Sequence, residues 1–172
     1  MTPVEIRMPL AMIEIVNLAD LVDQLTEVIT ATHSDRDPAV ARLTPNPYPE
    51  DAEASVEFTM ATRDDLLNRR TADAALVRGA LDPFLDPADE RDERSEVELV
   101  VSAHEIDAWL RTLTALRLII ASRLRITDDS DLEDADDPRF NVFHWLGFRL
   151  DTMIALADEH EESPDGRAAT EE

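Results

Sequence analysis

Residues 102–125 read SAHEIDAWLRTLTALRLIIASRLR, and this stretch decides the fold. Ser102 is followed three residues later by Glu105, a capping-box pattern that satisfies free backbone amides at the start of a helix. At about 100° per residue, the large apolar side chains that follow recur on one helical face. They are Ile106, Trp109, Leu110, Leu113, Leu116, Ile120 and Leu124. The sequence therefore predicts one continuous helix over about residues 103–125.

The predicted helix is apolar on more than one side, because Leu118 and Ile119 lie away from its main face. A helix of this kind is typical of the middle of a bundle. We therefore expect a mainly α fold, a bundle of about five helices. The length suits a single helical domain over residues 1–162, and residues 163–172 are expected to form a disordered tail.

Two short segments alternate between apolar and polar residues. They are residues 2–8, where Val4, Ile6 and Met8 alternate with charged residues, and residues 96–101, which read EVELVV. We expect them to pair into a short two-stranded β-ribbon beside the helices. Two alternatives remain open: either segment also fits extended coil, and residues 96–101 also fit the start of the following helix.

Helical periodicity recurs on both sides of the central stretch. It predicts a first helix over about residues 10–31 and a last helix over about residues 139–161. Prolines predict a loop over residues 32–50. Helical structure should resume at residue 50, with a fresh helix start at Thr62 and a second helix that runs to about residue 81.

Arg117 interrupts the main apolar face of the central stretch. A guanidinium there must either reach solvent along its stem or meet an acid. Asp151, beside the apolar face of the last helix, is the first expected partner, and Glu14, in the first turn of the first helix, is the second. His144 lies on the Asp151 side of the last helix. We therefore predict a buried polar cluster of these four residues, which is either structural or binds a ligand.

The two tryptophans are candidate interface residues. Trp145 points away from the apolar face of the last helix, and Trp109 lies on the two-sided central helix. Aromatic side chains are enriched at the centres of protein interfaces. Gly147, in the middle of the last helix, indicates a close approach to a neighbouring helix, because glycine costs about 1 kcal/mol there relative to alanine.

The composition excludes several classes of function. All sixteen basic residues are arginine, and 39 acidic residues bring the net charge to −23, which repels phosphate polymers and argues against direct nucleic-acid binding. The chain contains no cysteine, which excludes disulfides, thiol redox sensing and thiolate metal sites. It has neither a long apolar segment nor a signal peptide, so we expect a cytoplasmic protein without membrane association.

Motifs for catalysis and for cofactors are missing from the sequence. His104 and Glu105 begin like a zinc-protease motif, but residue 108 is alanine instead of the second histidine. The acidic run that starts at Asp129 has Asp134 where a calcium loop requires glycine. There is no glycine-rich phosphate loop and no nucleophile elbow. We therefore expect no enzymatic activity, no cofactor and no metal.

Several short strings occur in an order and spacing that resemble a known family. They are DPAVARL (37–43), PY (47–48), DAEASVEF (51–58), RDDL (63–66), AWL (108–110), LRL (116–118), SRL (122–124) and WL (145–146). Together they resemble, over about residues 5–158, the actinobacterial family long known as a domain of unknown function. Genes of that family often lie near a Clp-protease adaptor, and its members are also called actinomycete oxidative-stress regulators. The resemblance implies a regulatory protein that is linked to transcription through protein contacts.

We therefore expect a non-enzymatic cytoplasmic regulatory protein that acts through protein–protein contacts in transcription control. The acidic surface favours a protein partner with a basic face, such as a transcription component. The two-sided central helix and Trp145 favour a homo-oligomer. The alternative function is a small-molecule or ion-binding helical module that uses Arg117, Asp151 and His144.

Overall fold

The computed structural model describes residues 5–31, 36–86, 91–127 and 137–162 of the 172-residue chain, with side chains placed up to residue 159. In this part, the chain folds into five α-helices and one two-stranded antiparallel sheet, which confirms the mainly α prediction and the β-ribbon. The predicted tail and most of the acidic run after Thr127 lie outside the described residues.

The ribbon consists of β1 (Glu5–Ala11) and β2 (Glu96–Ser102), which bury alternate residues on the face that meets the helices. β1 continues directly into α1 (Met12–Thr30). This helix begins two residues later than predicted, because Leu10 lies opposite Val97 in the ribbon and is buried there. The pairing of two strands far apart in the sequence therefore overrides the helical periodicity at this position.

α4 (Ile106–Leu124) is the predicted central helix. It follows β2 through a 3₁₀ turn (Ala103–Glu105), where the Ser102 amide donates to the Glu105 carboxylate at 3.3 Å and forms the predicted capping box. The helix ends at Arg125, which has a left-handed φ of 59°. The turn and the helix together form the single rod that the sequence indicated.

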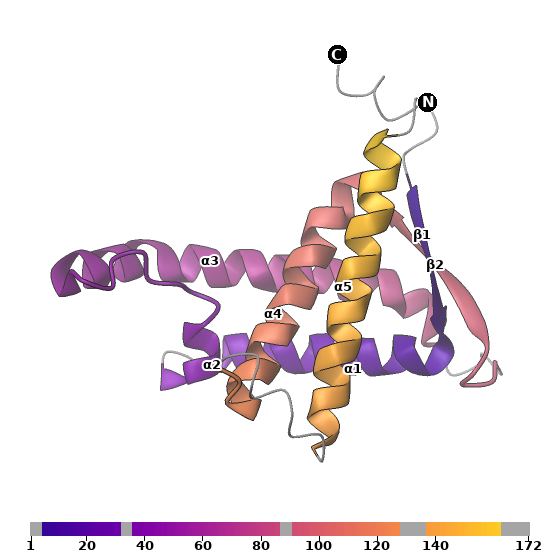
Figure 1. The fold of residues 1–172 in the computed structure, drawn as a ribbon, viewed down its shortest axis with the longest axis horizontal. Helices are drawn as coiled ribbons and strands as arrows, with labels where there is room; N and C mark the ends of the chain where they lie inside the picture. The colour runs from indigo at the N-terminus through magenta and orange to yellow at the C-terminus, as the bar shows by residue number, and fades with distance from the viewer. Residues whose placement is uncertain (1–4, 32–35, 87–90, 128–136, 163–172) are drawn as a thin grey trace.

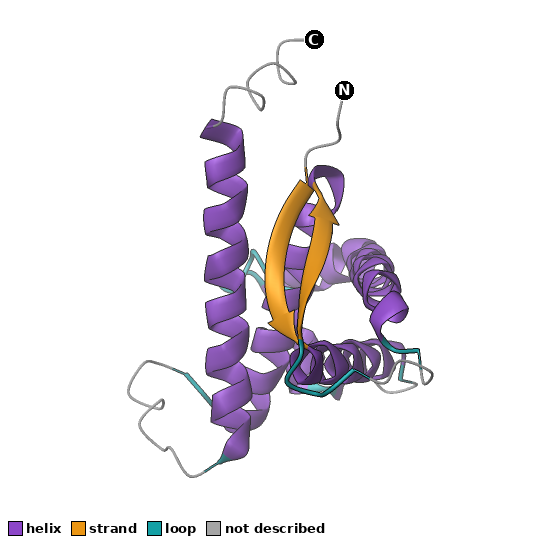
Figure 2. Cartoon of the chain, turned by 90° about the vertical axis from the view of Figure 1, so that its right-hand side faces the viewer, coloured by secondary structure: helices purple, strands orange, loops and turns teal. Residues whose placement is uncertain are grey.

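The helices form two antiparallel pairs that cross each other (Figure 1). One pair is α4 with α5 (Pro138–Glu162), and the other is α1 with α3 (Ala52–Leu81). The short α2 (Pro38–Ala41) packs against α4. Figure 2 shows the ribbon beside α5, at the end of the bundle where α1 begins.

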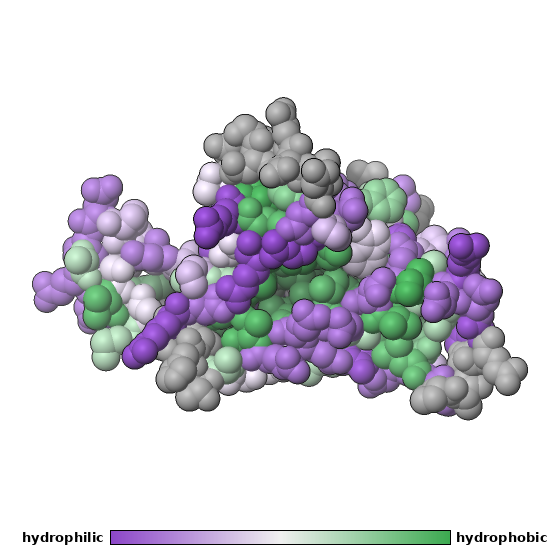
Figure 3. Space-filling view, turned by 90° about the horizontal axis from the view of Figure 1, so that it is seen from below, coloured by the Kyte–Doolittle hydropathy of each residue, from purple (hydrophilic) through white to green (hydrophobic). Residues whose placement is uncertain are grey.

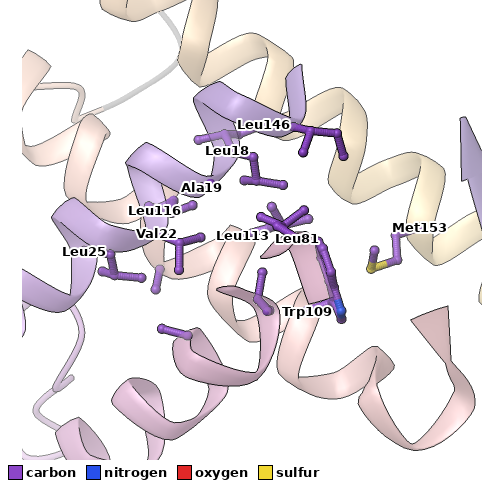
Figure 4. Close-up of a cluster of buried hydrophobic side chains, with 14 of the residues drawn as sticks. Leu18, Ala19, Val22, Leu25, Leu81, Trp109, Leu113, Leu116, Leu146 and Met153 are labelled. Atoms are coloured by element: carbon purple, nitrogen blue, oxygen red, sulfur yellow. The ribbon is translucent and has the colours of Figure 1, made fainter. Parts of the chain in front are cut away.

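The core lies where the two helix pairs cross, and side chains from α1, α3, α4 and α5 converge there (Figure 4). Its largest buried members include Leu18, Leu81, Trp109, Leu113, Leu146 and Met153. Full burial of each such side chain contributes about 1.5–3 kcal/mol to stability. Because α4 supplies both Trp109 and Leu113, the other helices pack around it.

α3 is one continuous helix, so the prediction of a fresh helix start at Thr62 is wrong. The Thr62 hydroxyl donates to the Phe58 carbonyl one turn earlier, at 2.8 Å, within an unbroken helix. The true N-cap is Asp51, whose carboxylate accepts from the Glu53 and Ala54 amides. A threonine that binds the preceding turn fits a helix interior as well as a cap, and the local sequence did not distinguish the two.

Candidate functional site

Glu14 lies in the first turn of α1 and connects the ribbon, α1 and α5. One of its carboxylate oxygens accepts from Arg149 Nη2 and Trp145 Nε1, both at 2.5 Å, and the other accepts from the Ala11 amide at 2.9 Å. The side chains of Glu14 and Arg149 are 22% and 14% exposed. Glu14 therefore pairs with Arg149 and not with Arg117, which corrects the predicted pairing.

The environment of Glu14 favours its ionised form. Burial alone would raise the pKa of this carboxyl, but hydrogen bonds from Arg149, the Ala11 amide and Trp145, together with the charge of Arg149, hold the pKa below its ordinary 4.5. A general acid at neutral pH needs a raised pKa. The Glu14 network is therefore suited to holding α5 and the ribbon on α1, and not to transferring protons.

Arg117 lies at the contact of α4 with α5 without a carboxylate. Its Cζ is 4.4 Å from the centre of the Phe143 ring, a cation–π contact. A Cβ placed on Gly147 would come within 3.2 Å of the same Cζ. No described residue forms a hydrogen bond or ion pair with Arg117, and its Nε is shielded from solvent. Gly147 thus permits a close approach, as the sequence indicated, but its close neighbour is this side chain.

The structure does not bring the predicted polar cluster together. Asp151 and His144 are both exposed on α5, and the His144 ring meets the Phe143 ring edge-on at 5.8 Å. The four predicted residues separate into the Glu14 network, the Arg117 contact and two exposed side chains. Arg149 was not predicted as a site residue, although it lies four residues after Trp145 and so shares its helical face.

A pocket of about 470 Å³ surrounds Arg117 between α4, α5 and the end of α2. Arg42 also lines it, and the Arg42 Nη2 donates to the Ile126 carbonyl at a long 3.4 Å. Thr114 and Thr127 also line this space. The remaining lining is apolar and consists of Leu118, Ala121, Ile126, Phe143 and Leu150. In the described part of the chain, no aspartate or glutamate lines this pocket.

The two candidate interface tryptophans have different positions. Trp109 is fully buried in the core, so it cannot form an interface in this fold, and that assignment is corrected. Trp145 is half-buried, and its indole donates to Glu14. Trp145 also lines a hollow of about 430 Å³ between α1 and α5, with Asn17, Asp20 and Asn141 at its polar rim. Trp145 therefore remains partly accessible, but its polar end is already satisfied within the chain.

The first half of α3 projects from the bundle (Figure 1). α3 buries Leu67, Ala74 and Leu81 against the body, whereas none of residues 52–66 is buried. We call residues 52–66 the arm, and at the rise of an α-helix they extend about 22 Å. The arm was not predicted, because the pattern at Thr62 indicated a helix boundary.

One side of the arm is apolar and uncovered. Val56 and Met60, one turn apart, are 60% and 82% exposed, and Figure 3 shows hydrophobic side chains on this projecting part. The same helical side is buried further along, because Met60, Leu67, Ala74 and Leu81 recur at intervals of seven residues. The core stripe of α3 therefore continues past the edge of the body. This seven-residue repeat is the signal that could have revealed the arm.

The arm also makes two contacts with its own chain. The Tyr48 ring meets the Phe58 ring edge-on at 5.9 Å, and Arg63 Nη1 donates to the Thr44 hydroxyl at 3.5 Å. These contacts stiffen the base and the middle of the arm. They leave the stripe of Val56 and Met60 open, so the arm has one free apolar side.

Within the described residues, no three histidine, aspartate or glutamate side chains gather in a way that could hold a metal ion. None of the described helices combines the length and apolarity needed to cross a bilayer.

Comparisons with known proteins identify a family without assigning an activity. No curated protein and no solved structure is significantly similar to the chain. The sequence profile of a domain of unknown function (DUF2017) matches residues 1–157. Since this match covers nearly the whole chain, the protein belongs to the DUF2017 family.

Proposed function

We propose that this chain is a non-enzymatic regulatory protein that acts through protein contacts, and that it works as a homodimer whose two arms pair. The observation that carries the proposal is the uncovered stripe of Val56 and Met60 on the arm. The arm packs few of its side chains, although most of the stability of a helix in a protein comes from the packing of its apolar face. A second molecule that covers the stripe would stabilise the arm and remove its apolar surface from solvent.

Charge favours a second copy of the arm as the occupant. Antiparallel pairing around a two-fold axis near residue 58 places Val56 against Met60 of the partner subunit. It also places Glu53 beside Arg63 of the partner subunit. Each of these contacts occurs twice, because the dimer has two-fold symmetry. Parallel pairing would instead set Glu53 and Glu57 beside their own copies. The charge pattern of the arm therefore supports the antiparallel homodimer.

Replacing the stripe with charge should abolish the dimer. Sedimentation equilibrium of the wild-type chain should give twice the 19.3 kDa chain mass, with dissociation only on dilution. The Val56→Glu/Met60→Glu double variant should sediment as a monomer at the same concentrations, because four like charges would face each other across the arm pair. The matched control is Phe148→Glu, on α5, where the native side chain is 61% exposed and lies outside the arm. This control should remain dimeric.

A charge swap tests the pairing itself. Glu53→Arg alone should weaken the dimer, and the added Arg63→Glu substitution should restore it, because the pair reverses its polarity. A wild-type chain that stays monomeric at every concentration would overturn the proposal. So would a control variant that dissociates as readily as the stripe variant.

We further propose that the protein regulates transcription through a transcription component with a basic face. The net charge of −23 supports a basic partner, and the resemblance to actinomycete oxidative-stress regulators supports the link to transcription. In a transcription reaction with purified RNA polymerase holoenzyme from the same organism, the protein should change the transcript yield. The change should diminish as salt rises, because screening weakens charge attraction. An unchanged yield, or the same change with an unrelated protein of equal negative charge, would contradict this role.

A further inference from the structure

We propose that the pocket around Arg117 binds a small organic oxyanion, a carboxylate or phosphate group on an apolar body, with Arg117 and Arg42 as its cationic ligands. The pocket lies between α4, α5 and the end of α2, and none of its lining residues belongs to the arm. The inference therefore does not depend on the dimer.

The charge balance around the pocket favours an anionic ligand. The chain has 39 acidic residues and only 16 arginines. Between described residues, six arginines bind carboxylates, namely Arg7, Arg78, Arg111, Arg123, Arg139 and Arg149. Arg117 and Arg42 have no carboxylate among the described residues, although they share one pocket. Within the described residues, two cations without a counter-charge make this pocket locally positive, and an anion is the ligand that neutralises them.

The Arg117 side chain has a fixed position. Its guanidinium is stacked on the Phe143 ring at 4.4 Å and backed by Gly147, so the stem and the plane of the group are held. The Nε is enclosed without an acceptor, whereas the Nη nitrogens remain open to the pocket. A planar guanidinium donates two parallel hydrogen bonds to a carboxylate or phosphate. A held arginine loses little side-chain entropy when such an anion binds.

The lining of the pocket predicts the part of the ligand that carries the anionic group. Apart from the two arginines and two threonines, the lining residues are apolar. Its volume of about 470 Å³ falls within the range of small-molecule sites, about 300–1,000 Å³. A bare inorganic ion would leave Leu118, Ile126 and Leu150 in contact with water. An oxyanion on an aromatic or aliphatic body would cover these walls and reach both arginines.

Titration of the full-length protein with four probes tests the inference. The probes are benzoate, phenyl phosphate, inorganic phosphate and neutral benzamide, followed by amide NMR shifts and by calorimetry at low salt. Benzoate or phenyl phosphate should bind and shift resonances of α4 and α5 around the pocket. Inorganic phosphate should bind more weakly by about tenfold, because it covers no apolar wall, and benzamide should not bind. Comparison of the two aromatic acids shows which headgroup the arginines prefer.

Three variants separate the binding role from a structural one. Arg117→Met and Arg42→Gln should each lower the affinity for the aromatic anion by about tenfold, because each removes one charge-assisted contact. Arg117→Met should still fold, because no ion pair is lost and methionine retains the apolar stem, and a thermal melt would verify this. Gly147→Ala should keep both charges but push the guanidinium from its position, and so should also weaken binding.

The matched control is Arg7→Gln, which removes an exposed arginine from the ribbon and should leave binding unchanged. The inference is overturned if none of the anionic probes binds. It is also overturned if Arg117→Met, shown to be folded, binds as tightly as the wild type. Equal affinity for inorganic phosphate and phenyl phosphate would show that the apolar walls do not contribute to binding, and would also overturn the inference.

Discussion

Replacing Trp109 with alanine is expected to lower the free energy of unfolding by about 3–5 kcal/mol. The Trp109 side chain is fully buried on α4, near Leu81 of α3 and Met153 of α5 (Figure 4). Alanine would leave a cavity among helices that are fixed by their other contacts, so the site could collapse only in part. A loss of this size is a large share of the stability of a single domain, which is typically about 5–15 kcal/mol.

Urea unfolding followed by circular dichroism would measure this loss. Trp109→Phe should cost less than half as much, because the ring still fills most of the space. The indole Nε1 of Trp109 has no acceptor among the described residues, so phenylalanine sacrifices no hydrogen bond. Phe148→Ala is the matched exposed control and should change stability by no more than about 0.5 kcal/mol. A Trp109→Ala loss as small as that of the control would contradict the burial of this side chain.

The elements that depend on local pattern were predictable from the sequence. The periodicity of residues 102–125 and the pair Ser102 and Glu105 predicted α4 and its start, and alternation predicted both strands of the ribbon. These patterns involve residues that are close together in the sequence. They therefore do not depend on contacts with distant parts of the chain.

The rotation of α5 was not predictable in the same way. On a helical wheel, Ile154 shares a face with the apolar residues Phe143 and Leu150, which predicts that it is buried. In the structure Ile154 is 40% exposed, and the face that meets the bundle includes Leu146 and Met153. This rotation turns Asp151 to solvent and brings Arg149 to Glu14. α5 carries apolar residues on several sides, so packing against the neighbouring helices determines which side is buried. The sequence of the helix alone does not predict this orientation.

The arm was missed for a related reason. Met60 and Leu67 occupy equivalent places in the seven-residue repeat of α3, yet Leu67 is 8% exposed and Met60 is 82% exposed. The repeat predicts a continuous apolar stripe but not where the body that covers it ends. The environment of Arg117 was not predictable either. A helical wheel shows that an arginine interrupts the apolar face, but it does not show that the side chain packs against Phe143 and Gly147 of α5.

Glu14→Gln is expected to lower the free energy of unfolding by about 2–4 kcal/mol, since the substitution leaves the Arg149 charge largely shielded and without its counter-ion. Glutamine has the same size, so the loss reports the charge and the hydrogen bonds, and not a cavity. The matched control is Asp151→Asn, a carboxylate on the exposed side of α5, which should have little effect. A Glu14→Gln loss no larger than the control would show that the network contributes nothing to stability.

The pH dependence of this loss identifies its source. Because the pKa of Glu14 in the folded protein lies below the ordinary 4.5, the folded state binds its proton less readily than the unfolded chain does. The contribution of Glu14 should therefore be complete above about pH 4.5 and should disappear as the pH falls through the lowered pKa. Other carboxylates also titrate in acid, so the quantity to follow is the difference in stability between wild type and Glu14→Gln from pH 7 downwards. That difference should stay constant to about pH 4.5 and then shrink, because a protonated Glu14 no longer neutralises Arg149. A difference that persists at full size in strong acid would assign the stabilisation to side-chain shape instead of to the charge that joins α1 and α5.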